Sequence, residues 1–119
     1  MKLRIKGDSL RLRLTRPEVQ ELVERGSVEA AARFADAARF GYAVRLDDAA
    51  NALTAKFATG CVTVTVPAQQ AQQWAASDAV GIYGEDGPLT LAVEKDFACI
   101  DRDDPEDADA FPNPKGSVC

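Results

Sequence analysis

The chain has 119 residues, a length that suits one domain, and is 46% hydrophobic, 28% charged and 7% aromatic. It contains no run of about 18 apolar residues and does not open with the apolar core of a secretory signal, so we expect a cytoplasmic protein without a membrane span. The absence of histidine excludes Ser-His-Asp catalysis, Cys-His catalysis and histidine-ligated zinc.

The net charge of −5 is unevenly distributed along the chain. Residues 1–16 carry six cations against Asp8, whereas residues 94–119 carry eight carboxylates against three cations. A basic start and an acidic end are typical of segments that meet a charged partner or each other.

The first half predicts a hairpin, a helix and a second hairpin. Residues 2–6 and 9–14 alternate apolar with mostly basic residues around Gly7-Asp8, which suits a tight β-turn. A helix should follow, because Thr15 and Glu18 have capping-box spacing and Gly26 favours a stop. Residues 28–34 are rich in alanine, yet they alternate, and we assign them to a strand paired with residues 42–46.

The second half has the same pattern 52 residues later, with almost no residue identity. Strands are expected at residues 53–57 and 62–66, a helix after Pro67, and two more strands from Val80 onward. Two hairpin–helix–hairpin units would give about eight strands and two helices. We therefore predict an α+β domain over residues 1–100, built mainly from an antiparallel sheet or barrel, and an acidic proline-containing tail over residues 101–119.

The first hairpin carries the most specific functional pattern. A two-residue turn at Gly7-Asp8 would place Arg4 opposite Arg11 and Lys2 opposite Arg13. One face would be apolar and the other would hold the cations Lys2, Arg4, Lys6, Arg11 and Arg13. Two interpretations remain open: a site for an anion such as phosphate, or a solvated face that Glu94, Asp96 or the acidic tail neutralises. We do not expect nucleic acid, because the face lacks interleaved aromatic residues.

Other candidate sites are weaker. Glu94 and Asp96 fall on one face of a strand and could hold Mg²⁺ or Mn²⁺, although a charged, solvated strand face has the same pattern. The three cysteines, Cys61, Cys99 and Cys119, form no C-x-x-C pair and are expected to be reduced thiols. Cys61, Trp74 and Phe57 fit core positions. The tail is either disordered or anchored in an extended form around Phe111.

Three stretches of the chain resemble an uncharacterised family of small bacterial proteins, a domain of unknown function. They are residues 1–11 (MKLRIKGDSLR), residues 94–99 (EKDFAC) and residues 111–114 (FPNP), and the resemblance spans nearly the whole chain. It implies a bacterial protein and supplies no activity.

The two-unit architecture also resembles the triphosphate-tunnel (CYTH-like) enzymes, although the Glu-x-Glu-x-Lys opening of that family is absent. We expect a non-enzymatic binding module that takes an anionic small molecule or a protein partner on the basic hairpin face and needs no cofactor. The acidic tail would fold over that face or compete for it. The alternative is a metal-dependent tunnel-type phosphohydrolase, with the hairpin cations facing phosphate and Glu94 and Asp96 holding Mg²⁺ or Mn²⁺.

Overall fold

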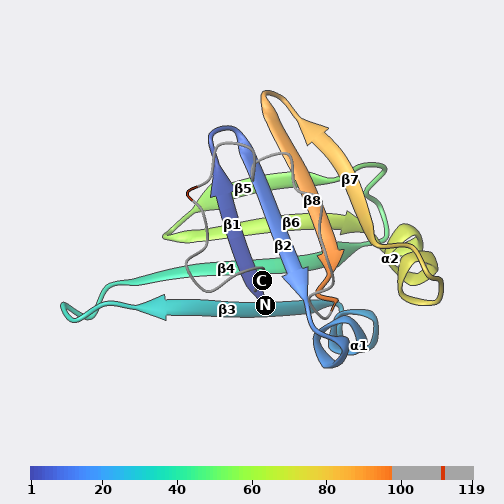
Figure 1. Ribbon diagram of the computed structural model, residues 1–119, viewed down its shortest axis with the longest axis horizontal. Coiled ribbons are helices and arrows are strands. Elements are labelled where there is room, and N and C mark those ends of the chain that lie inside the picture. The colour runs from blue at the N-terminus through green and yellow to red at the C-terminus, as the bar shows by residue number, and fades with distance from the viewer. Residues whose placement is uncertain (98–110, 112–119) are drawn as a thin grey trace.

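The computed structural model describes residues 1–97 and Phe111 (Figure 1). Residues 1–97 form eight strands and two helices, which confirms the predicted α+β class. In chain order, the elements are β1 (Lys2–Lys6), β2 (Ser9–Leu14), α1 (Arg16–Arg25), β3 (Ser27–Arg33), β4 (Arg39–Asp47), β5 (Thr54–Ala58), β6 (Cys61–Pro67), α2 (Ala68–Ala75), β7 (Gly81–Asp86) and β8 (Leu89–Lys95). Neither described helix is long and apolar enough to cross a membrane.

The described strands form two separate four-stranded sheets, so of the two predicted forms the sheet is present and the barrel is not. The first sheet has the order β1-β2-β8-β7 and the second has the order β3-β4-β6-β5. The sheets stack with their strands crossing steeply, and both helices lie at one end of the stack (Figure 1). Each sheet is mixed, because its two antiparallel hairpins are joined by one parallel pair, β2 with β8 or β4 with β6.

Each half of the chain contributes one hairpin to each sheet. Helix α1 carries the chain from the first sheet to the second, and α2 carries it back. When the elements of the two halves are exchanged, the strand orders of the two sheets become identical. Neither half therefore completes a sheet without the other.

Local sequence signals explain the first helix and the strand that follows it. Both the backbone N–H and the hydroxyl of Thr15 donate to Glu18 Oε1, each at 2.9 Å, as capping-box spacing predicts. The helix ends at Gly26, whose φ of 86° lies in the left-handed region that favours glycine. The alanine-rich residues after it form β3, as predicted, because pairing with β4 outweighs their helix propensity.

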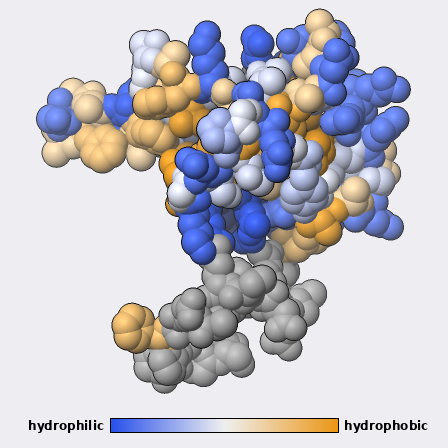
Figure 2. Space-filling view, turned by 90° about the horizontal axis from the view of Figure 1, so that it is seen from above, coloured by the Kyte–Doolittle hydropathy of each residue, from blue (hydrophilic) through white to orange (hydrophobic). Residues whose placement is uncertain are grey.

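The core fills the space between the sheets and includes Leu12, Val44, Val64, Val93 and Trp74, each at most 3% exposed. Two predicted core positions are wrong: Ile5 is 56% exposed and Phe57 is 67% exposed. Both lie on strands at the edge of a sheet, where the facing sheet ends before it can cover them. The β3–β4 hairpin also runs out well past β1 (Figure 1). Hydrophobic surface is gathered toward that protruding end (Figure 2).

We expect Glu18 to make stability dependent on acid pH. Partial burial raises the pKa of its carboxyl, but hydrogen bonds from the Met1 ammonium, 2.5 Å away, and from Thr15 outweigh burial and lower the pKa below its ordinary value of 4.5. Because the pKa is lower in the folded state, this stabilisation is complete above about pH 4.5 and is lost as pH falls through the folded pKa.

Denaturant titrations at a series of pH values check this. The free energy of unfolding of the unmodified chain should fall between about pH 5 and pH 3 more steeply than that of Glu18→Gln. Glu21→Gln changes an exposed residue of the same helix and should keep the steep slope. Equal slopes for the unmodified chain and Glu18→Gln would contradict the assignment.

Candidate functional site

The predicted register of the first hairpin is confirmed. Lys2 pairs with Arg13, Arg4 with Arg11 and Lys6 with Ser9, while Leu3 and Leu12 share the opposite face. Because strand side chains alternate between faces and Leu12 is fully buried, the five cations lie on the outer face of the first sheet, away from the core. We call this surface the basic face: the outer side of β1 and β2, with the side chains of Lys2, Arg4, Lys6, Arg11 and Arg13.

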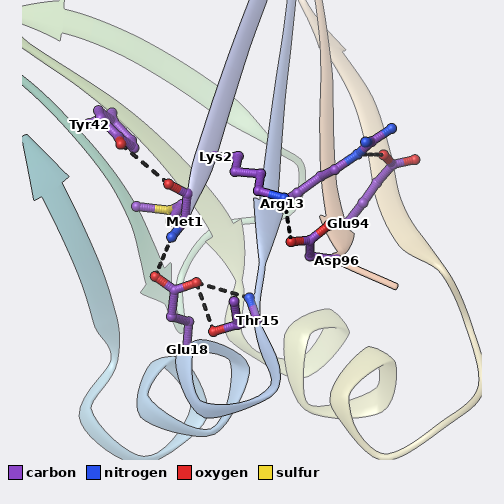
Figure 3. A network of polar contacts seen from close by, with 8 residues as sticks. All are labelled: Met1, Lys2, Arg13, Thr15, Glu18, Tyr42, Glu94 and Asp96. Atoms are coloured by element: carbon purple, nitrogen blue, oxygen red, sulfur yellow. Dashed lines mark hydrogen bonds and ion pairs between the residues drawn. The ribbon is translucent and has the colours of Figure 1, made fainter. Parts of the chain in front are cut away.

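Two carboxylates of the same sheet neutralise part of the basic face. The parallel register of β2 and β8 puts Glu94 opposite Arg13, and Glu94 Oε1 lies 3.4 Å from Arg11 Nε and 3.5 Å from Arg13 Nε. Asp96 Oδ2 lies 3.0 Å from Lys2 Nζ (Figure 3). Three of the five cations therefore have an intramolecular carboxylate partner, which is one of the two arrangements that the sequence left open.

Sequence reasoning missed Tyr83, an aromatic residue on the same outer face of the sheet. Its hydroxyl donates to Glu94 Oε2 at 2.7 Å, so both oxygens of Glu94 have partners. Gly81 makes this contact possible, because a Cβ there would lie 2.8 Å from Glu94 Cγ and 2.9 Å from the Tyr83 hydroxyl oxygen. The outer face is thus not devoid of aromatic residues, as we had expected. Tyr83 was not predictable because only the pairing of β7 with β8 brings it to Glu94.

The environment of Tyr83 raises the pKa of its phenol above 10. Partial burial is the larger cause, and the hydrogen bond to Glu94 and the charge of that carboxylate add to it, because a phenolate beside a carboxylate is unfavourable. The arginines on β2 act in the opposite direction but do not cancel the shift.

The contacts of Glu94 and Asp96 are those of ion pairs. Both carboxylates reach cations of the same face, as their predicted placement on one side of the strand requires. Within residues 1–97 and Phe111, no group of three or more acidic or cysteine side chains could hold a metal ion. The geometry therefore adds no support for Mg²⁺ or Mn²⁺ at this pair, and a metal role stays a prediction.

The remaining predicted residues lie elsewhere in the fold. Trp74 is buried, and its Nε1 donates to the carbonyl of Val80 at 3.1 Å, which confirms a core position. Cys61 begins β6 and is half-buried. Cys99 and Cys119 lie outside the described residues, as does the tail apart from Phe111, which is 97% exposed.

Two hollows were not predicted from the sequence. A groove of about 270 Å³ opens between the sheets near the turn of the first hairpin and is lined by Ile5, Leu10, Phe40, Phe57 and Leu89, among others. The rings of Phe40 and Phe57 lie 6.1 Å apart there. A larger pocket of about 570 Å³ lies at the ends of β2 and β8 against α1, with Leu14, Val19 and Phe97 among its apolar lining.

Comparison with known proteins identifies the family of the chain. The model of DUF7009, a family of unknown function, matches residues 1–115, and the chain therefore belongs to this family. No curated protein matches the chain. No solved structure matches it either.

The link between Tyr83 and Glu94 predicts a shifted phenol titration. Glu94→Gln removes the carboxylate charge, so the pKa of Tyr83 should fall toward 10. Ultraviolet difference titration at alkaline pH measures this directly, since the chain has only two tyrosines. Tyr83→Phe leaves Tyr42 alone and assigns the two transitions. An unchanged titration of Tyr83 in Glu94→Gln would refute the contact.

Proposed function

We propose that this member of DUF7009 is a non-enzymatic binding module that takes an anionic partner on the basic face. The observation that carries the proposal is the placement of five cations on one outer surface of two adjacent strands. Glu94 and Asp96 offset part of this charge, and the five cations outnumber these two carboxylates. An anionic small molecule or an acidic protein segment has the complementary charge.

Repulsion within the face favours such a partner. Lys2 and Arg13 are directly opposite each other, as are Arg4 and Arg11, and like charges so placed cost roughly 0.2–1 kcal/mol per pair. Glu94 contacts Arg11 and Arg13 through their Nε atoms. Each guanidinium has five N–H donors, so an ion pair at Nε leaves donors that a phosphate or carboxylate can use. An incoming anion would add attraction without dismantling the pairs already present.

The geometry favours binding over tunnel-type hydrolysis. In a tunnel the cations would face inward, whereas here the space between the two sheets is filled by the apolar core. The basic face is open to solvent, with the side chain of Lys2 74% exposed. Salt should screen binding at such a surface strongly, because the Debye length is about 8 Å at physiological ionic strength.

Inorganic triphosphate is a suitable first probe, tested by thermal shift with and without Mg²⁺. Binding to the folded state raises the unfolding midpoint by mass action, by about 2.7 kcal/mol of stability when triphosphate is 100-fold above its Kd. Arg4→Glu with Arg11→Glu should abolish the shift.

Arg33→Glu with Arg39→Glu is a matched control, because these arginines also face each other across two strands, but in the second sheet. This control has the same change in net charge and should keep the triphosphate shift. If the Arg4/Arg11 variant binds as the unmodified chain does, the basic face is not the site. Release of phosphate from triphosphate in the presence of Mg²⁺ or Mn²⁺ would instead favour the hydrolase alternative.

A further inference from the structure

We propose that the acidic segment of this same chain, residues 103–109, adds as a strand along the open edge of β1 and competes there with external anions. This inference rests on the proposed function, because it uses the same basic face. It goes further by naming the occupant and the backbone edge that holds it.

The first support is the open edge of β1. β1 is the end strand of its sheet, and no described strand pairs with it on the side away from β2. An edge strand presents backbone N–H and C=O groups that another extended segment can use. Of the five residues of β1, only Leu3 is even half-buried.

The second support is an uncovered apolar surface beside that edge. The Tyr42 hydroxyl donates to the Met1 carbonyl at 3.3 Å, which places the start of β1 over Tyr42 (Figure 3). The next pair on the same side of β3 and β4, toward the hairpin tip, is Ala32 and Phe40. Because the β3–β4 hairpin extends past β1, a strand added beside β1 would lie over this part of the hairpin (Figure 1).

The third support is the sequence of the segment. Residues 103–109 contain five carboxylates and no cation. Asp107 and Asp109 alternate with Ala108 and Ala110. In an added strand, the two aspartates would share one face, beside the cations of β1, and the small alanines would face the second sheet. Charge and size thus match both faces of the vacant position.

The fourth support is reach. The contact of Lys2 with Asp96 shows that the chain leaves β8 beside the first residue of β1. A position beyond β1 is about 15 Å from β8, because neighbouring strands lie about 4.8 Å apart. The residues between Phe97 and Asp107 can span about 30 Å when extended. The segment is therefore long enough and starts at the correct end of the sheet.

Hydrogen exchange of the full chain tests the proposal through the β1 amides that point away from β2. A first variant neutralises the segment with Asp103→Asn, Asp104→Asn, Asp107→Asn and Asp109→Asn. A second variant, Ala108→Pro, keeps every charge but removes a backbone donor and disfavours a strand. In both variants we expect these amides to exchange at least tenfold faster, and triphosphate to bind at least threefold more tightly.

The matched control neutralises four exposed carboxylates elsewhere, with Glu21→Gln, Glu29→Gln, Asp48→Asn and Asp78→Asn. It has the same net charge as the first variant and should leave β1 exchange unchanged. If the β1 amides exchange at the same rate in the unmodified chain and in both segment variants, the inference is overturned, even where triphosphate binding stands. If the amides respond as expected but no variant binds triphosphate, the segment is placed correctly and the proposed anion binding fails.

Discussion

The parallel pairing of β2 with β8 joins the two ends of the described fold, and the basic face depends on it. β2 belongs to the first hairpin and β8 to the last, so this pair closes a sheet from strands about 80 residues apart. The register sets Arg13 beside Glu94, and the same oxygen of Glu94 also reaches Arg11. A shift of one residue would turn Glu94 toward the core, where an unpaired carboxylate is costly. Charge pairing and core packing therefore specify the same register.

The sequence predicted what depends on neighbours along the chain. The alternation around Gly7-Asp8 fixed both the hairpin and its cross-strand pairs, and the spacing of Thr15 and Glu18 fixed the start of α1. It could not predict strand order, because the parallel pairs join segments that share no turn. The contact of Tyr83 with Glu94 and the exposure of Phe57 follow from that order and from where each sheet ends. The candidate cations were thus predictable, whereas their partners in space were only partly so.

The two sheets are equivalent in strand order but not in length, and the difference lies at the β3–β4 hairpin. The corresponding hairpin, β7–β8, has a tight turn at Gly87, whereas β3 and β4 are joined by a longer connection between Arg33 and Arg39. The longer arm carries apolar residues beyond the cover of the first sheet, and Phe34 there is 57% exposed. Lysine and arginine on an edge strand discourage random pairing between molecules, so the cations of β1 also protect the sheet from aggregation. The same charges make the edge selective for an acidic strand.

A tethered acidic segment would set a threshold for any external partner. Short flexible tethers give effective concentrations in the millimolar range, so a monovalent anion that binds weakly would not displace the segment. A partner with several negative charges would gain more, because it contacts several of the same cations at once. Salt would weaken the tethered segment and the external partner together, since both depend on the same screened charges. Selection in this arrangement would therefore follow the number and spacing of negative charges on the partner, and the spacing along β1 favours an extended chain with an acid at every second residue.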